Sequence, residues 1–276
     1  MTQPFSEFLP LRATGGTSYE LPVGLPLCSG LRTLWGGCGL AAVVEVMQQV
    51  TDRPCAWAAV QYLRPIHPGQ VLALDVELGV QGRRITQAQV SGRVAGQLVL
   101  VGHGSLGGAG ETDEQFVSAP PEVPSPEQSV ERSMPLRVDP SGTILARLEQ
   151  RWAQAPYPLR EDGAIGSGRT LVWMRLRDAG ETTRGTLAVL ADLAPSAVSE
   201  ALGVMAGGVS LDNTIRYART GSVAPGGWVL LEVSVEAVVA DIAQLAVRVF
   251  DEQGTLLAVG GQSAVVRRVA TPRTPQ

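Results

Sequence analysis

The pattern of apolar and polar positions divides the chain into segments of helix length and of strand length. Residues 38–50 are apolar nearly all round the helix that they predict, and a helix without a polar face is buried inside a fold. Shorter segments follow with partial alternation and tight turns, a pattern typical of an antiparallel meander. These predicted strands cover residues 56–63, 71–80, 84–94 and 97–102. One buried helix followed by a long antiparallel sheet indicates an α+β unit.

A further strand is predicted before this helix, and a second set of elements follows a proline-rich stretch. Pro10 would confine the strand over residues 8–14 to a sheet edge. The second set begins with a short amphipathic helix over 141–153, a strand over 170–176 and a helix from about 183 to Pro195. Its remaining strands cover residues 211–217, 228–239, 243–250 and 255–259. The second half therefore repeats the order of the first.

The repeat is visible residue by residue at its end, where residues 96–102 match 254–260. Two copies of one unit usually pack into a pseudo-symmetric whole. Residues 107–131 lie between the copies and are rich in glycine and proline, a composition typical of a linker. We therefore predict an N-terminal unit over 1–110, a linker over 111–135 and a C-terminal unit over 136–276.

Composition excludes several classes of function. The net charge is -4 at pH 7 and there is no long basic run, so neither nucleic acid nor an anionic membrane surface is an expected partner. All 22 basic residues are arginine, which excludes a Schiff-base lysine and a phosphate-loop lysine. The cysteines Cys28, Cys38 and Cys55 lack CxxC spacing, which disfavours a disulfide framework and a zinc site. We expect neither a metal nor a bound cofactor.

The sequence predicts neither a signal peptide nor a membrane helix. The N-terminus lacks the basic region and apolar core of a signal peptide. No run reaches the ~18 apolar residues that a membrane helix needs. We therefore expect a cytoplasmic protein with no membrane partner.

Five short motifs follow one another along the two halves. They are Trp35-Gly36-Gly37, Tyr62-Leu63-Arg64-Pro65, Leu190-Ala191-Asp192, Ser210-Leu211-Asp212 and Val259-Gly260-Gly261-Gln262. Together with the duplicated helix and sheet, they resemble the type II, TesB-like acyl-CoA thioesterases. The resemblance implies a double hotdog, in which each of two tandem units wraps a long antiparallel sheet round a central helix. It also implies hydrolysis of fatty acyl-CoA in fatty acid metabolism, and a homodimer or higher homo-oligomer.

The family's catalytic trio, an Asp, a Ser or Thr, and a Gln, carries over to Asp192, Ser210 and Gln262. A carboxylate among apolar neighbours has a raised pKa, which suits a general base. Ser210 and Gln262 offer neutral groups that can hold a water without competing for its proton. Ser210 lies in no GxSxG motif, so direct attack by water is favoured over an acyl-serine. Gln262 falls opposite Gly104 in the repeat, which is consistent with duplication and loss of one site.

Four further residues are candidates for substrate binding: Gly37, Cys38, Arg64 and Asp212. Backbone N–H groups at a helix start suit a developing oxyanion, so Gly37 and Cys38 are candidates for that role. Arg64 is a candidate for contact with the CoA phosphates. The segment after Asp212 departs from the family pattern, because residues 213–216 replace its aromatic and histidine residues. That departure bears on the range of substrates.

Other acidic and basic side chains keep alternatives open. Asp212 lies two residues from Ser210 on the same predicted strand face, so it competes with Asp192 as the acid and otherwise supports the site. Glu45 lies near the position equivalent to Asp192, as a relic acid or, as we favour, a buried partner for an arginine. His103 would be the catalytic histidine of an acyl-thioester dehydratase or hydratase. The remaining alternative is a non-catalytic acyl-thioester-binding or scaffold protein.

Overall fold

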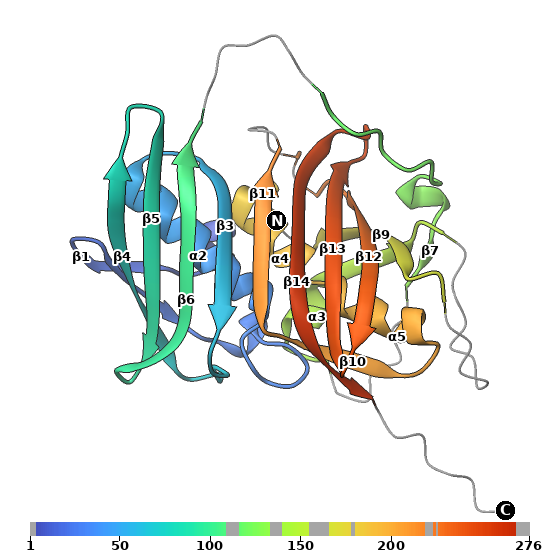
Figure 1. Cartoon of the computed structure of the whole chain (residues 1–276), viewed down its shortest axis with the longest axis horizontal. Helices are drawn as coiled ribbons and strands as arrows, with labels where there is room; N and C mark the ends of the chain where they lie inside the picture. Colours follow the sequence, from blue (N-terminus) through green and yellow to red (C-terminus); the bar gives the residue numbers. More distant parts are fainter. Residues whose placement is uncertain are drawn as a thin grey trace, which may run out of the picture.

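Two hotdog units share one antiparallel sheet in the computed structural model of the chain (Figure 1). The structure describes residues 4–108, 116–132, 140–154, 166–177, 180–218, 223–224 and 226–268. Within these residues the sheet has 14 strands. The two long central helices lie on the same side of it (Figure 1). The predicted α+β double hotdog is therefore confirmed.

The first unit wraps its sheet round α2 (Gly36–Thr51). Its other elements are α1 (Phe5–Phe8), β1 (Arg12–Gly15), β2 (Ser18–Pro22), η1 (Leu25–Leu27), β3 (Cys55–Tyr62), β4 (Val71–Gln81), β5 (Ile85–Val94) and β6 (Gln97–Gly107). The strands lie in the order β1-β2-β4-β5-β6-β3. Every residue of α2 from Gly37 to Val44 is buried, as its apolar pattern predicts. The helix ends at Asp52, whose φ of 50° is left-handed.

The second unit repeats this arrangement round α4 (Arg184–Ala191). Its other elements are η2 (Pro126–Gln128), β7 (Val130–Glu131), α3 (Ile144–Arg147), β8 (Leu148–Trp152), β9 (Arg169–Leu176), η3 (Ala194–Ala197), α5 (Val198–Leu202), β10 (Ala206–Ser210), β11 (Asp212–Tyr217), β12 (Val229–Val239), β13 (Ile242–Asp251) and β14 (Leu256–Arg268). The strands lie in the order β11-β14-β13-β12-β9-β8-β7, and β10 also pairs with β14.

The two units are related by pseudo-symmetry about the contact between β3 and β11, which pair antiparallel. Going outward from that contact, β6 in the first unit takes the place of β14 in the second. Tyr62 of β3 pairs with Leu100 of β6, and Tyr217 of β11 pairs with Ala258 of β14. This register reproduces the match between residues 96–102 and 254–260, so the repeat predicted from the sequence is confirmed.

The helix predicted over residues 141–153 is wrong for most of its length. Only α3 is helical there, and β8 follows it directly and pairs with β9. Leu148 and Gln150 are buried, while Glu149 between them and Arg151 after them are partly exposed. That spacing has the period of two residues that belongs to a strand. Five residues are too few to separate this period from that of a helix by sequence alone.

The strand predicted over residues 8–14 is also partly wrong. Phe8 ends the short helix α1, and the strand β1 begins only at Arg12. Phe8 and Leu9 are both buried, so their packing into the core decides the local conformation. β1 pairs with β2, which was not predicted, and it lies at the edge of the sheet.

Two strands run further than predicted because glycines interrupt their apolar patterns. β6 continues through Gly104 to Gly107, and β14 continues through Gly261 to Arg268. A Cβ at Gly104 would lie 2.5 Å from the carbonyl oxygen of Trp57 in β3 and 2.8 Å from the Cε atom of Met47 in α2. This glycine therefore marks a close approach of the neighbouring strand and of the helix, and not a strand end.

The proline-rich stretch between the units packs on the outer face of the second unit's sheet. Trp173 donates from Nε1 to the carbonyl oxygen of Pro124 at 2.8 Å, and Arg151 donates to that of Pro126 at 2.8 Å. Val123 packs against a small separate cluster of buried apolar residues. Residues 116–132 thus cover apolar surface, although their composition is typical of a linker.

The start of α2 lies against the end of α4. Trp35, just before α2, donates from Nε1 to the carbonyl oxygen of Val189 at 3.0 Å. A Cβ at Gly37 would lie 2.7 Å from the carbonyl oxygens of Ala188 and Val189, so only glycine permits this approach. The packing brings the N-terminus of one helix to Asp192, which follows the other. Of the helices that the structure describes, none is long and apolar enough to span a membrane.

Candidate active site

Asp192 is the C-terminal cap residue of α4. The helix begins after Thr183, whose hydroxyl accepts a hydrogen bond from the N–H of Thr186 at 3.2 Å. Pro195 cannot continue an α-helix, and the chain enters the 3-10 helix η3 instead. Only 3% of Asp192 is exposed, so an acidic side chain lies within the core.

Both oxygens of the Asp192 carboxylate have hydrogen-bond donors. Oδ2 accepts from the N–H of Gly37 at 2.7 Å, and Oδ1 accepts from Nδ2 of Asn213 at 2.9 Å. Gly37 belongs to the first turn of α2, where the helix dipole favours negative charge. The first unit therefore supplies one donor to an acid of the second unit. The two sides of this contact are 155 residues apart in sequence.

Burial raises the pKa of Asp192 from 3.8 to about 7. The Gly37 N–H opposes this rise most, followed by the Ser210 hydroxyl, the Gln262 amide and the Gly36 N–H. The donors therefore stabilise the charged form without cancelling the cost of removing it from water. A carboxyl group with a pKa near neutrality can exchange protons at physiological pH, as a general base must.

Ser210 and Gln262 lie together beside this carboxylate. The Ser210 hydroxyl, at the end of β10, donates to Oε1 of Gln262 in β14 at 3.1 Å. Gln262 is 4% exposed, and its Nε2 has no regular hydrogen bond to any described residue. The same amide is close enough to lower the pKa of Asp192. The structure thus brings the three residues predicted from the sequence to one place.

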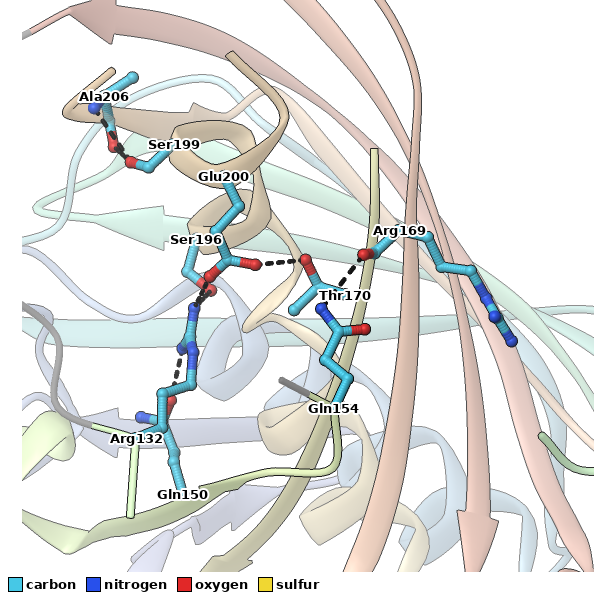
Figure 2. A network of polar contacts seen from close by, with 9 residues as sticks. All are labelled: Arg132, Gln150, Gln154, Arg169, Thr170, Ser196, Ser199, Glu200 and Ala206. Atoms are coloured by element: carbon cyan, nitrogen blue, oxygen red, sulfur yellow. Dashed lines mark hydrogen bonds and ion pairs between the residues drawn. The ribbon is translucent and has the colours of Figure 1, made fainter. Parts of the chain in front are cut away.

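A polar network anchors the segment that leads into Ser210 (Figure 2). Arg132 forms an ion pair with Glu200 of α5 at 2.8 Å, and it also donates to Gln150 at 2.7 Å. Thr170 of β9 donates to the other oxygen of Glu200 at 2.5 Å. These contacts attach α5 to β8 and β9. Because β10 follows α5 closely, the network helps to fix where Ser210 lies.

Tyr62 adds a second contribution from the first unit. Its hydroxyl donates to the carbonyl oxygen of Gly36 at 2.5 Å. Burial raises the pKa of Tyr62 most, the negative charge of Asp192 raises it further, and a hydrogen bond with Asn213 lowers it. Tyr62 therefore lies beside the acid as a neutral phenol and holds the start of α2 in place.

Asp212, the competing acid, faces a different partner. Its Oδ1 accepts from the N–H of Ser263 at 2.8 Å, which joins the start of β11 to β14. Cys38 is fully buried, and its N–H already donates to the carbonyl oxygen of Trp35 at 2.9 Å. Neither residue offers the site what the sequence suggested, a second acid or a free N–H group.

The remaining candidates lie away from the acid. Arg64 is exposed in the turn after β3. His103 is also exposed, and its ring makes an edge contact with Trp57 at 5.3 Å between centroids. Gly102 and Gly104, on either side of His103 in β6, both face α2. The histidine therefore points from the outer face of the sheet, so the structure gives no support to its use as a dehydratase base.

Asn213 is the site residue that sequence reasoning missed. It appeared there only as a departure from the family pattern. Its side chain is 2% exposed, and Ile215, two residues later in β11, is buried on the same face. A polar residue at an inward position of a strand was the available signal. The sequence predicts a strand from Leu211, whereas in the structure β10 ends before Leu211 and β11 begins after it. This break decides which residues of β11 point inward, so the inward position of Asn213 was not recognised.

Comparisons with known proteins agree with this architecture. Residues 26–107 match the family model for the acyl-CoA thioesterase N-terminal domain, and residues 118–266 match that for the C-terminal domain. Among curated proteins, no sequence matches the chain.

Solved structures give the same picture. A candidate thioesterase from Novosphingobium aromaticivorans is 31% identical with a TM-score of 0.83, and the match covers 92% of this chain and 97% of that one. An acyl-CoA thioesterase II, TesB2, from Mycobacterium marinum is 18% identical with a TM-score of 0.74, over 96% and 98% of the two chains. A hot dog protein of unknown function from Alicyclobacillus acidocaldarius is 16% identical with a TM-score of 0.80, over 97% and 98%. From the two family models and the first of these structures, the chain belongs to the acyl-CoA thioesterase family.

Proposed function

We propose that this protein hydrolyses acyl-CoA thioesters with a water molecule that Asp192 activates. The observation that carries the proposal is a buried carboxyl group with a pKa of about 7, beside Ser210 and Gln262. Leaving a buried amide donor such as Nε2 of Gln262 unpaired costs about 1–3 kcal/mol. A water that accepts from this donor and donates to Asp192 would satisfy it and would be in position to react.

The reaction needs one base and no covalent intermediate with the enzyme. Asp192 takes a proton from the water as its oxygen attacks the thioester carbonyl carbon, and the carbonyl electrons move to the oxygen. Collapse of this tetrahedral intermediate breaks the C–S bond. The CoA thiolate leaves and takes the proton from Asp192, so the products are the fatty acid and CoA. Ser210 and Gln262 hold the water in place until it attacks.

Release of CoA tests the proposal against its alternatives. The wild-type protein is incubated with acyl-CoAs of different chain length, and free thiol is measured with a chromogenic disulfide reagent. Hydrolysis supports a thioesterase. Acyl-CoA binding without thiol release would instead indicate a non-catalytic binding or scaffold protein. A change in the absorbance of a conjugated enoyl thioester, without thiol release, would indicate a dehydratase or hydratase.

The pH dependence of kcat/KM is expected to follow the titration of Asp192. The general base must be ionised, and burial raises its pKa to about 7. We therefore expect kcat/KM to rise tenfold per pH unit well below pH 7 and to level off above it. The measurement is initial rates from pH 5 to 8.5, corrected for uncatalysed hydrolysis. A profile that is flat across this range would contradict Asp192 as the base.

Replacing Asn213 by alanine is expected to move this profile to higher pH. The change removes the 2.9 Å hydrogen bond to Oδ1, and a buried carboxylate that loses a donor is harder to ionise. A hydrogen bond to a charged group contributes about 1.5–3 kcal/mol, so kcat/KM at pH 7, where about half of wild-type Asp192 is ionised, should fall by roughly 7- to 80-fold. Thr214→Ala is the matched control, since Thr214 is partly exposed and donates to the Gly261 carbonyl at 3.0 Å. A loss of activity with an unshifted profile would argue against a positioning role for Asn213.

A further inference from the structure

Tyr62 and Asp192 contact opposite ends of one peptide group. Tyr62, at the end of β3, donates to the carbonyl oxygen of Gly36 at 2.5 Å. The N–H of the same peptide group belongs to Gly37, and it donates to Oδ2 of Asp192 at 2.7 Å. Two hydrogen bonds therefore run in one direction, from the phenol through the peptide group to the carboxylate. In such a chain each bond polarises the next and strengthens it, by about 10–30%.

The hydroxyl proton of Tyr62 has no second use in the site. A phenol has one O–H donor, so the hydroxyl that donates to the Gly36 carbonyl cannot also donate to Asp192. Burial, and then the charge of Asp192, raise the pKa of Tyr62 well above its ordinary value, so the phenol does not exchange its proton at neutral pH. Tyr62 is therefore neither a direct donor to the carboxylate nor a general acid. Its effect on Asp192 must pass through a group that contacts both.

Asn213 is a second group that contacts both side chains. Its Nδ2 donates to Oδ1 of Asp192 at 2.9 Å, and a hydrogen bond from Asn213 also lowers the pKa of Tyr62. A bond that lowers the pKa of a phenol is one that the phenol oxygen accepts. Tyr62 thus accepts from Asn213 on one side and donates to Gly36 on the other. The result is a ring of hydrogen bonds in which both carboxylate oxygens are acceptors.

The close packing of α2 holds this ring together. A Cβ at Gly36 would lie 3.0 Å from Oδ2 and 3.2 Å from Oδ1 of Asp192, and 3.3 Å from the Tyr62 hydroxyl oxygen. A Cβ at Gly39 would lie 3.2 Å from Cε1 of the same tyrosine ring. Gly36 and Gly39 therefore allow the acid and the ring to approach the helix closely, so the hydroxyl stays directed at the Gly36 carbonyl.

Titratable and charged groups face this ring from several elements. Among the described residues they are Cys38 of α2, Cys28 before it, Arg147 of α3, Tyr62 of β3 and Asp212 of β11. Burial raises the pKa values of Cys38 and Tyr62 most, and the charge of Asp192 raises both further, so both stay protonated at neutral pH. Asp212 accepts from the Ser263 N–H and acts on Tyr62 less than Asp192 does. Asp192, with a pKa of about 7, is therefore the group that a profile near neutral pH reports.

We propose that Tyr62 is a positioning residue that stabilises the ionised form of Asp192 through the Gly36–Gly37 peptide group and Asn213. The hydroxyl draws electron density towards the Gly36 carbonyl, which makes the Gly37 N–H a stronger donor to the carboxylate. A tyrosine of the first unit thereby helps to set the pH range in which an acid of the second unit is charged. That this acid is the general base rests on the proposed function.

The second unit supplies a matched control. Tyr217 donates to the carbonyl oxygen of Arg184 at 2.8 Å, and the next N–H, that of Gly185, donates to Glu45. Tyr217→Phe therefore removes the equivalent hydroxyl from the start of α4, beside a different acid. Any loss that comes only from removing a phenol at a helix start should be similar in the two variants.

The first test is the pH profile of kcat/KM for Tyr62→Phe with an acyl-CoA as substrate. Without the hydroxyl the carboxylate is harder to ionise, so the midpoint should move up by about 0.5 pH unit. kcat/KM should then fall about threefold at pH 6 and recover at pH 9, where the base is ionised in both proteins. Tyr217→Phe should keep the wild-type midpoint. An unmoved midpoint for Tyr62→Phe, or the same fall at every pH, would overturn the proposal.

Urea unfolding tests the same step without catalysis. Asp192 is protonated in the folded protein at pH 5 and ionised at pH 9, so Tyr62→Phe should cost more stability at pH 9. The extra loss should be roughly 0.3 M in the urea midpoint, and it should vanish in the Asp192→Asn background. Equal losses at both pH values would contradict the role of Tyr62. If wild type releases no CoA, the proposed function fails, and this comparison still decides whether Tyr62 stabilises the charge.

A second variant covers the case in which Tyr62→Phe does not fold. Incorporation of 3-fluorotyrosine at position 62 keeps the hydroxyl and makes it a stronger donor. The midpoint of the kcat/KM profile should then move to lower pH, opposite to the effect of phenylalanine, because the charged carboxylate gains stability. A midpoint that stays in place or moves to higher pH would exclude the proposed route from Tyr62 to Asp192.

Discussion

Asp192→Asn is expected to lower kcat for acyl-CoA hydrolysis by about 10³-fold, since a positioned general base typically contributes about 10²–10⁴-fold. The asparagine keeps an oxygen that can accept from the Gly37 N–H, now 2.7 Å from Oδ2. Its NH2 group then faces Asn213, whose amide must turn so that the Asn213 oxygen accepts. The shape of the site is thereby retained while its base is removed. The measurement is kcat with saturating acyl-CoA at pH 8, where wild-type Asp192 is ionised.

Asp212→Asn is the informative comparison because Asp212 is the competing acid. An asparagine there can still accept from the Ser263 N–H, now 2.8 Å away. We expect this variant to keep kcat within about threefold of wild type, the scale of a surface substitution. If Asp212→Asn lost activity and Asp192→Asn kept it, the two acids would have to exchange roles.

Asp192→Asn should be more stable than wild type at pH 8, although it is less active. A carboxyl group whose pKa is raised on folding binds its proton more tightly in the folded state. Its contribution to stability therefore falls as the pH rises from 3.8 to about 7, by an amount on the order of 4 kcal/mol at most. The variant should unfold at a higher urea concentration than wild type at pH 8 and at a similar one at pH 4. Equal midpoints at pH 8 would mean that Asp192 ionises without cost.

Much of the fold follows from local patterns in the chain. The apolar run over 38–50 predicts a buried helix because no face of it is polar, and α2 is buried as expected. The internal repeat predicts the pseudo-symmetry because the two copies have the same register on their central strands. β8 was not predicted, because a five-residue strand next to a single helical turn has too few positions to distinguish the hydrophobic period of a strand from that of a helix.

The candidate site was predictable in its acid, hydroxyl and amide, and not in its geometry. Those three residue types came from motifs in the second half. The N–H of Gly37 and the side chain of Asn213 reach the acid through the packing of α2 on α4 and the register of β11. Such contacts depend on how separate elements dock, and a sequence pattern within one element carries no information about that. Glu45 was predicted as a relic acid or a buried partner for an arginine, and only the structure identifies the arginine: burial raises the pKa of Glu45, and the charge of Arg184 opposes that rise.

Gly37→Ala is expected to destabilise the protein and to lower its activity together. The added Cβ would lie 2.7 Å from the carbonyl oxygens of Ala188 and Val189 and 2.8 Å from Asp192 Cβ. Because two of these atoms belong to the backbone, α2 and α4 must move apart. Overpacking of this kind typically costs about 1–3 kcal/mol, and the better helix propensity of alanine offsets only about 1 kcal/mol.

We expect a net loss of about 1 kcal/mol, which corresponds to a fall in melting temperature of roughly 2–4 °C for a chain of this size. kcat should fall as well, because a displaced helix no longer donates from Gly37 to the carboxylate. Gly207→Ala is the matched control, since a Cβ at Gly207 meets no atom within 4 Å and its φ is not left-handed. If the two variants had the same melting temperature and the same kcat, the close packing of α2 on α4 would not be what holds Asp192 in place.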